Sequence, residues 1–176
     1  VPFVALGSSE SSGDYAALDL DFAGVARSSV ERLVHAGHRR ILLGLTSQET
    51  NSNFAFLAGY QQGLADVGLE YDEGLVLRPY DRIAGGHELA NVLLDMPERP
   101  TAVLLIQETM AMGLYQKLQS AGLRPGQDVA VIGFRENPVC RYLSPSLTSF
   151  RVDLRKYGQR LGETIIAETV GTRKSD

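Results

Sequence analysis

A strand–helix–strand segment between residues 99 and 150 constrains the fold of this chain more than any other feature. An apolar run at residues 102–106 leads into an amphipathic helix, and a turn then precedes a second apolar run at residues 129–134. Two short strands joined by a single helix form a βαβ unit, in which the two strands are parallel. The segment therefore predicts a parallel sheet covered by helices.

Polar residues follow both of these predicted strands directly. Gln107 and Glu108 come after the first strand, and Arg135 and Glu136 come after the second. In open parallel sheets, ligands bind outside the carboxyl ends of the strands. We therefore expect a ligand-binding site where these residues lie.

The rest of the chain continues the alternation of strands and helices. Gly37 and Gly68 end two of the predicted helices, and a continuous apolar run at residues 1–6 is typical of a buried parallel strand. In the last helix, Leu154, Leu161 and Ile165 form an apolar stripe that we expect to face a core. The pattern indicates an α/β protein with a doubly wound parallel sheet. The remaining predicted strands are residues 17–20, 41–45, 75–77 and 147–150, and the remaining predicted helices are residues 22–36, 56–67, 84–94 and 153–170.

Composition and charge exclude several classes of protein. With 44% hydrophobic and 22% charged residues, the chain of 176 residues has an ordinary globular composition. The net charge is −4 and no block of Lys and Arg occurs, so this part of the protein is not expected to contact DNA. No run approaches a membrane span, and residues 1–7 lack the charged start of a signal peptide. The single cysteine, Cys140, cannot form an internal disulfide, so we expect a reduced, cytoplasmic protein.

The sequence offers no set of residues suited to catalysis. His35 and His38 flank a helix end, where they are expected to cap carbonyl groups, and His87 is expected to be solvated. The Ser- and Gly-rich loop at residues 7–14 lacks the Lys of a phosphate-binding loop, and no serine lies in a Gly-x-Ser-x-Gly turn. We predict that the chain is not an enzyme and holds no metal or cofactor.

Six short motifs, in register along the chain, resemble the lactose/galactose repressor (LacI/GalR) family. The resemblance extends from Val1 to about Gly171 and thus covers nearly the whole chain. The motifs are Gly37-His38-Arg39-Arg40-Ile41, Leu57-Ala58-Gly59-Tyr60, Pro100-Thr101-Ala102-Val103, Ala111-x-Gly113, Ala121-Gly122-Leu123-x-Pro125-x-x-Asp128-Val129-x-Val131-x-Gly133-Phe134 and Pro145-x-Leu147-Thr148.

The resemblance implies a fold like that of periplasmic binding proteins, with two lobes joined by crossovers and preceded by a DNA-binding helix-turn-helix. On this basis residues 1–20 end the first lobe and residues 21–141 form the second, effector-binding lobe. Residues 142–176 are then a crossover strand and a helix that return to the first lobe. The helix-turn-helix and the final return strand are expected outside this chain.

The function implied by the resemblance is effector sensing in a bacterial transcriptional regulator, most simply a repressor of sugar utilisation. A sugar or sugar derivative would bind between the lobes of a homodimer and control binding of operator DNA by the helix-turn-helix. The alternative is a periplasmic sugar-binding protein of an ABC transporter, which shares the fold and would carry an upstream signal peptide.

By motif position, the resemblance also implies which residues contact the effector. For Tyr80, stacking on the apolar face of a sugar and a half-buried structural position remain open alternatives. Glu108 is either a partner of the helix start or a ligand contact. The implied effector-binding residues are Gly7, Asp19, Thr50, Ser52, Phe56, Tyr80, Gln107, Glu108, Arg135 and Val152.

Two residues depart from what the family commonly has at these positions. Phe56 stands where family members often carry an Arg, and Arg135 stands where they often carry an Asp. We hypothesise that the effector has an apolar face and an anionic group near Arg135. The alternative is that Arg135 forms an ion pair with Glu136 or Glu108 and contacts no ligand.

The resemblance further implies that a dimer forms along the helices at residues 84–94 and 108–120, together with the loop at residues 139–143. Apolar residues occur on more than one face of the second helix, although burial within the lobe would explain some of them equally well. The predicted interface residues are Leu89, Met110, Met112, Leu114 and Leu143.

Overall fold

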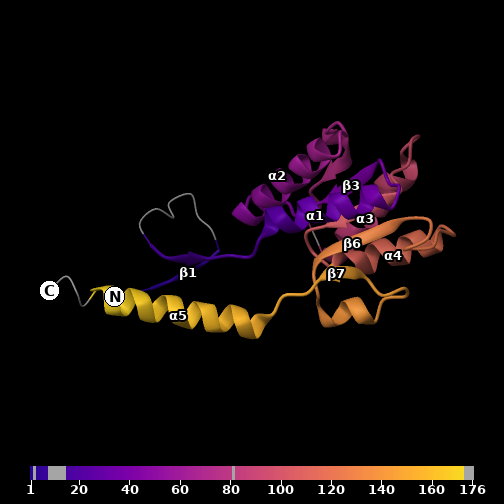
Figure 1. The fold of residues 1–176 in the computed structure, drawn as a ribbon. Coiled ribbons are helices and arrows are strands. Elements are labelled where there is room, and N and C mark those ends of the chain that lie inside the picture. Colours follow the sequence, from indigo (N-terminus) through magenta and orange to yellow (C-terminus); the bar gives the residue numbers. More distant parts are fainter. Residues whose placement is uncertain (2, 8–14, 81, 173–176) are drawn as a thin grey trace. The chain divides into compact units, whose positions relative to one another are not determined.

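The computed structural model describes residues 1, 3–7, 15–80 and 82–172 and divides the chain into two units (Figure 1). The larger unit is Phe22–Arg151, and the smaller unit combines Val1–Asp21 with Val152–Asp176. Most of the Ser- and Gly-rich loop, residues 8–14, lies outside the described residues. Within the described ranges, no helix is both long and apolar enough to cross a membrane.

A five-stranded, fully parallel sheet forms the centre of the larger unit, as the sequence predicted. All residues of the two strands β3 and β5 are buried, which explains why both are continuous apolar runs. The strands lie in the order β4-β3-β5-β6-β7. Their bounds are β3 (Ile41–Gly44), β4 (Val76–Leu77), β5 (Ala102–Leu105), β6 (Ala130–Arg135) and β7 (Thr148–Phe150).

Two pairs of helices cover this sheet. Helices α1 (Phe22–His35) and α2 (Asn51–Asp66) pack on each other, and α1 contacts β5 and β6. Helices α3 (Arg82–Asp95) and α4 (Met110–Ser120) form the second pair and share one apolar cluster with β3, β5 and β6. The predicted helices are thus present, and each is amphipathic because its inner face covers the sheet.

Glycines let the helices of each pair approach closely. A Cβ atom at Gly86 of α3 would lie 1.9 Å from the carbonyl oxygen of Met110 in α4, and one at Gly113 of α4 would lie 2.0 Å from that of Ile83. At Gly59 of α2 the corresponding distance, to the carbonyl oxygen of Ala23 in α1, is 2.1 Å. No side chain fits at such distances, so the glycines fix how closely the helices pack.

The boundaries of several elements differ from those predicted. Helix α2 begins five residues before Phe56 because the side chain of Thr50 caps it by accepting a hydrogen bond from the backbone N–H of Asn53. A 3-10 helix, η1 (Glu73–Leu75), precedes β4, and another, η2 (Pro138–Arg141), interrupts the predicted loop after β6. None of these differences alters the predicted order of strands and helices.

The smaller unit contains two short parallel strands and a long helix. Strand β1 (Ala5–Leu6) pairs with β2 (Ala17–Leu18), and the hydroxyl of Tyr157 in α5 (Leu154–Thr172) donates a hydrogen bond to the carbonyl of Leu18. The prediction of buried positions is wrong here for two segments. Phe3 and Leu6 are exposed in the first, and Leu154 and Ile165 are exposed in α5. Among the residues that the structure describes, no further layer buries this two-stranded sheet as the helices bury the sheet of the larger unit.

The division between the units also differs from the predicted boundary at residues 141 and 142. Strand β7 pairs with β6 and so belongs to the sheet of the larger unit, which ends at Arg151. The assignment of the two units to two lobes stays a prediction.

Candidate functional site

The carboxyl ends of all five strands lie at one edge of the sheet, since the strands are parallel. The chain passes from β3 to β4 on one side and then returns to β5 on the other side of β3. The strand order therefore reverses between β3 and β5, and ligands of such sheets bind in the crevice outside this switch point. Gln107, two residues after β5, follows the strand that borders the switch point.

Gln107 is the residue at this edge whose polar atoms are least satisfied. Its side-chain oxygen Oε1 is buried and accepts no hydrogen bond from any described residue. A buried acceptor without a partner costs about 1–3 kcal/mol, so few persist in proteins without a reason. A ligand that donates a hydrogen bond, such as a sugar hydroxyl, would satisfy this atom.

A buried asparagine fixes the loop between β3 and α2 on the other side of the switch point. The amide nitrogen of Asn53 donates to Oγ1 of Thr46 at 2.7 Å and to the carbonyl of Gln48, and its Oδ1 accepts from the backbone N–H of Thr46. The hydroxyls of Thr50 and Ser52 lie 2.9 Å apart in the same segment, partly exposed. This loop is therefore held in one conformation before any ligand binds.

Asn53 was missed by the sequence reasoning, although one signal was present. An amide at the third position of a helix, on the same inward face as Phe56, has to find partners when it is buried. That signal predicts hydrogen bonds between Asn53 and the loop that precedes α2, and it does not indicate a ligand.

Glu108 is held by a second asparagine that the sequence reasoning also missed. Its carboxylate is buried and accepts a hydrogen bond of 2.9 Å from the amide of Asn137, which also caps η2 by accepting from the N–H of Val139. The Nε atom of Arg135 lies 4.0 Å from the same Glu108 oxygen, beyond hydrogen-bond distance. Glu108 is thus anchored to the turn after β6, and Arg135 forms at most a long ion pair with it.

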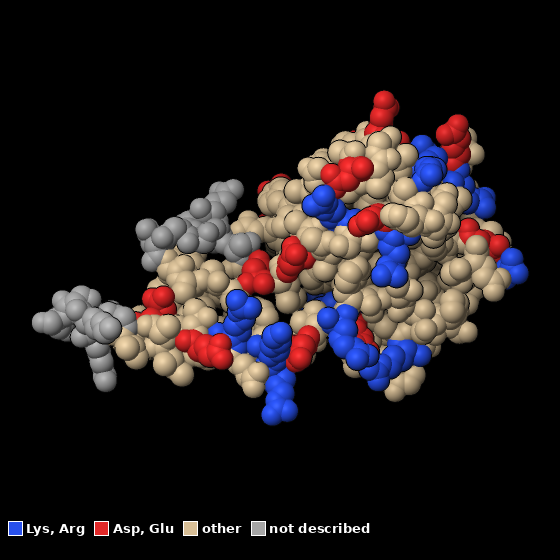
Figure 2. Space-filling model, in the orientation of Figure 1, with Lys and Arg blue, Asp and Glu red and all other residues tan. Residues whose placement is uncertain are grey.

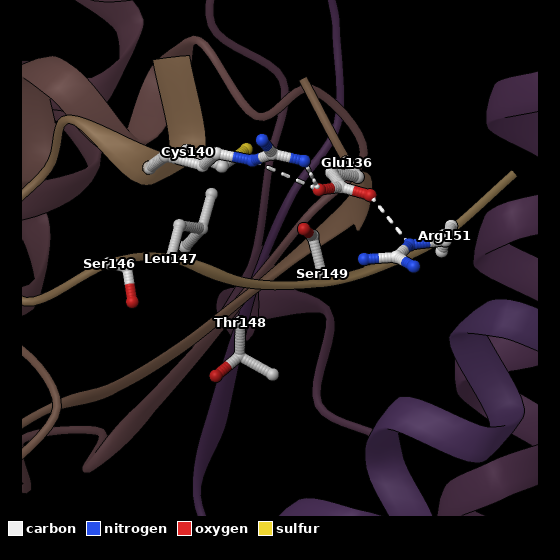
Figure 3. Close-up of a pocket in the computed structure, with 8 residues that line it drawn as sticks. Glu136, Cys140, Ser146, Leu147, Thr148, Ser149 and Arg151 are labelled. Carbon is white, nitrogen blue, oxygen red and sulfur yellow. Dashed lines mark hydrogen bonds and ion pairs between the residues drawn. The ribbon is translucent and has the colours of Figure 1, made fainter. Parts of the chain in front are cut away.

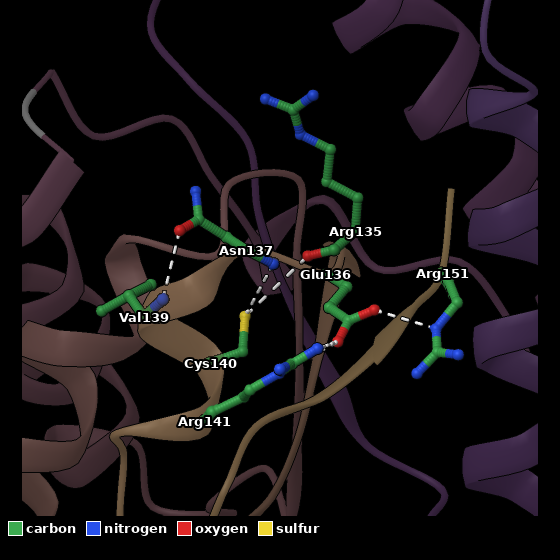
Figure 4. A network of polar contacts seen from close by, with 7 residues as sticks. All are labelled: Arg135, Glu136, Asn137, Val139, Cys140, Arg141 and Arg151. Atoms are coloured by element: carbon green, nitrogen blue, oxygen red, sulfur yellow. Dashed lines mark hydrogen bonds and ion pairs between the residues drawn. The ribbon is translucent and has the colours of Figure 1, made fainter. Parts of the chain in front are cut away.

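Glu136 takes no part in an ion pair with Arg135 because two other arginines bind it. One of its carboxylate oxygens accepts from Nη2 of Arg141 at 2.7 Å, and the other accepts from Nε of Arg151 at 3.0 Å (Figure 4). The hydrogen bonds from Arg141 and then Arg151 hold the pKa of Glu136 below its usual range. Glu136 is therefore an anion that joins η2 to the end of β7.

This ion-pair network lines a pocket of about 320 Å³ beside β7 (Figure 3). Glu136 and Arg151, joined by their hydrogen bond, both line it, and the thiol of Cys140 donates to the carbonyl of Arg135 at 3.9 Å. The cysteine is thus part of the turn that follows β6. The lining residues are Glu136, Cys140, Arg141, Ser146, Leu147, Thr148, Ser149 and Arg151.

Phe56 does not lie where the resemblance implied. Its side chain has no exposed surface, and its ring packs edge-on against Phe134 with 5.8 Å between ring centroids. The ring of Phe134 in turn stacks on Phe22 at 4.3 Å. The interpretation that Phe56 adds an aromatic ring to the pocket is corrected by this arrangement, in which the ring belongs to the core between α1, α2 and β6.

Tyr80 is 92% exposed in the loop after β4, so the alternative of a half-buried structural tyrosine is wrong. Its ring is accessible for stacking, and its contact with an effector stays a prediction. Gly7, Asp19 and Val152 belong to the smaller unit, where Asp19 accepts a hydrogen bond from the N–H of Leu20.

Three of the five predicted interface residues are in the core. Leu89, Met110 and Leu114 are fully buried because they form the contact of α3 and α4 with the sheet, so they cannot contact a second chain. Met112 is 36% exposed, and Leu143 is partly buried against the core. Apolar periodicity alone cannot distinguish a face that packs within a lobe from one that packs on a partner.

Neither the surface charge nor the arrangement of possible metal ligands among the described residues indicates a further binding site. Figure 2 shows acidic and basic side chains interspersed on the face in view, without a continuous basic surface there. Among the residues that the structure describes, no group of three or more His, Cys, Asp or Glu side chains could hold a metal ion.

The fold defines a class of protein, the open parallel α/β domains, and ligands of such domains bind at the switch point of the sheet. Residues 30–175 match the family described as periplasmic binding protein-like domain. The chain belongs to this family and, within it, to the LacI/GalR transcriptional regulators, as its motifs predicted.

Similar proteins of known name agree with this assignment. The HTH-type transcriptional regulator CelR of Thermobifida fusca is 29% identical over 175 residues, which cover 97% of this chain and 51% of CelR. A LacI-family regulatory protein from Chloroflexus aggregans has a solved structure with a TM-score of 0.89 and 33% identity, covering 94% of this chain and 60% of that one.

A further solved structure, that of a complex of the transcriptional regulator CelR with cellobiose, has a TM-score of 0.87 and 28% identity. It is matched over 98% of this chain and 53% of its own length. Some curated relatives match nearly the whole of this chain, and the chain spans about half the length of each of them. The relatives named here are transcriptional regulators rather than enzymes.

Proposed function

We propose that this chain is the effector-sensing part of a transcriptional regulator that responds to a sugar or sugar derivative. The observation that carries the proposal is the buried, unpaired Oε1 of Gln107 beside the switch point of the sheet. Two features support it further: the loop preordered by Asn53, and the likeness to a regulator whose solved structure is a complex with cellobiose. Such a regulator works in the cytoplasm on operator DNA, through a DNA-binding module.

The mechanism follows from the geometry of the edge. A sugar hydroxyl donates to Gln107, and the exposed ring of Tyr80 offers a surface for the apolar face of the sugar. Effector binding then changes DNA affinity only if the effector binds two conformations of the regulator with different affinities. The competing assignment, a periplasmic sugar-binding protein, has no counterpart among the relatives named above.

Replacing Gln107 by methionine tests the proposed site. Methionine keeps the length of the side chain but removes the unpaired oxygen, so we expect unliganded stability to be unchanged or higher by about 1 kcal/mol. We expect affinity for the effector to fall at least tenfold, which corresponds to about 1.4 kcal/mol. The measurement is a thermal-shift screen of the full-length protein against neutral and acidic mono- and disaccharides, followed by calorimetric titration of the hits.

Gln127→Met is the matched control, since Gln127 is exposed in the loop before β6, at the opposite edge of the sheet. The control variant should bind as the unmodified protein does. The proposed site is refuted if Gln107→Met binds the hit with unchanged affinity. The proposed sugar response is refuted if no saccharide in the panel stabilises the protein.

We also propose that the regulator is a homodimer that associates through the outer surface of α3 and α4. Met112 and Ile83 are exposed on this surface, at 36% and 45%, and close to each other because Gly113 packs against the Ile83 carbonyl. His87 and Gln116 form a hydrogen bond of 2.9 Å across the two helices nearby. The surface combines apolar and uncharged polar groups, which is typical of protein interfaces.

Met112→Glu is expected to weaken such a dimer at least tenfold, because the interface would bury an unpaired carboxylate. Analytical ultracentrifugation of the full-length protein over a range of concentrations would measure the change. Phe54→Glu, which places the same charge on an exposed apolar position of α2, should leave the dimer intact. Equal dimer constants for the protein and its Met112→Glu variant would exclude this surface.

A further inference from the structure

Arg135 lies at the end of β6 with an accessible guanidinium group. Its side chain is 48% exposed, and Figure 4 shows it extending away from Glu136, Arg141 and Arg151. Leu105 and Gly133 are the last residue pair in the ladder between β5 and β6, and Gln107 and Arg135 each follow two residues later at the same edge of the sheet. Neighbouring strands are about 4.8 Å apart, so one small molecule can reach both residues.

The carboxylates around Arg135 are already bound by other groups. Both oxygens of Glu136 accept hydrogen bonds from Arg141 and Arg151, and Glu108 accepts one from Asn137. The distance of 4.0 Å between Nε of Arg135 and Glu108 is too long for a hydrogen bond. Three guanidinium groups thus share two carboxylates at this edge, and the ion pair of Arg135 with Glu108, one of the alternatives that the sequence left open, is the longest of the three.

We propose that the ligand of this edge carries an acidic group, a carboxylate or a phosphate, which Arg135 binds while Gln107 accepts a hydrogen bond from a hydroxyl of the same molecule. This inference rests on the proposed function and specifies its ligand class as sugar acids or sugar phosphates. The planar guanidinium matches both anions, since it donates two parallel hydrogen bonds to either.

A purely structural role for Arg135 would require a different geometry. A half-exposed ion pair at 4.0 Å contributes little to stability, and Glu108 keeps its hydrogen bond to Asn137 whether or not Arg135 stays nearby. Arg135 can therefore turn toward a ligand while Glu108 keeps its hydrogen-bond donor, the amide of Asn137. Arg135 is therefore available to bind an acidic group of a ligand, whereas Glu108 stays fixed by its hydrogen bond to Asn137.

The test compares each acidic saccharide with its neutral parent in calorimetric titrations of the full-length protein. Glucose is compared with glucuronate and glucose 6-phosphate, galactose with galacturonate, and ribose with ribose 5-phosphate. We expect at least one acid to bind tenfold or more tightly than its parent, with the carboxylate and phosphate members identifying which anion is preferred. Affinity for that acid should fall as salt concentration rises, because salt screens the interaction.

Arg135→Gln should reduce affinity for the acid at least tenfold and leave affinity for the neutral parent unchanged. Arg135→Lys keeps the charge but not the paired donors, so we expect it to retain part of the preference for the acid. Arg124→Gln removes a cation that pairs with Asp128 before β6, at the opposite edge, and should change neither affinity. Equal melting temperatures of the three unliganded variants would show that the fold is intact.

Two results would overturn the ligand class while leaving the proposed function in place. One is a neutral sugar that binds as tightly as its acid, and the other is an acid preference that survives in Arg135→Gln. If no compound of either kind binds, the proposed sugar response fails together with this inference.

Discussion

Replacing Gly86 by alanine is expected to destabilise the larger unit by about 3 kcal/mol or more. The new Cβ would lie 1.9 Å from the carbonyl oxygen of Met110 and 2.7 Å from the backbone nitrogen of Leu114. Both are backbone atoms, so no side chain can rotate away and α3 has to separate from α4. Urea denaturation followed by circular dichroism would measure the loss.

Gly158→Ala in α5 provides the matched control. A Cβ at Gly158 meets no atom within 4 Å, and alanine favours a helix over glycine by about 1 kcal/mol, so this variant should be as stable as the parent or more stable. If Gly86→Ala and Gly158→Ala showed the same unfolding midpoint, the close contact of α3 and α4 would not limit stability. Gly113→Ala should behave like Gly86→Ala, since its Cβ would lie 2.0 Å from the Ile83 carbonyl.

The sheet could be predicted from the sequence because its strands are buried on both faces. Continuous apolar runs such as β3 and β5 have few other interpretations when helices of adequate length separate them. A parallel sheet also places Gln107, which follows a strand, at the edge where ligands bind, whereas the reversal of strand order beside β3 is known only from the structure. This part of the candidate site is therefore a consequence of local pattern and chain connectivity.

The polar anchors of the site could not be predicted in the same way. Asn53 and Asn137 act through hydrogen bonds to Thr46 and Glu108, and these partners come together only when the loops have folded. The residues that flank Asn53 and Asn137 in the sequence are typical of helix starts and turns in general, so they did not indicate these partners. Nothing in the spacing of the chain indicated that Glu136 would bind Arg141 and Arg151 and leave Arg135 with the longest ion pair at this edge.

Three of the predicted interface residues were wrong for a related reason. Leu89, Met110 and Leu114 have the residue types and spacing of a buried face, and the sequence does not say which neighbour buries them. The glycines at positions 86 and 113 bring α3 and α4 close together, so these side chains fill the space between the helices and the sheet. The surface available to a partner is then limited to the exposed residues around Met112.

The resemblance implies that Phe56 lines the effector pocket, whereas the structure places it in the core. A charged residue at this position tests which of the two is correct. Phe56→Arg is expected to destabilise the protein by about 3–5 kcal/mol, because it removes a buried aromatic ring and places a cation against Phe134. Urea denaturation of both the variant and the parent would measure the change. Phe54→Arg is the matched control on the same helix, since Phe54 is 58% exposed, and should alter stability by no more than about 0.5 kcal/mol.

The comparison of these two variants determines which surroundings position 56 has in solution. If Phe56→Arg is as stable as Phe54→Arg, water or a ligand reaches position 56 and the core of Phe22, Phe56 and Phe134 opens readily. A large difference between them supports a closed aromatic core, in which the stacked rings fix the end of β6 and hence the position of Arg135. In that case the proposed effector site consists of Arg135 and Gln107 at the edge, and the packed core beneath it is not expected to contact the ligand.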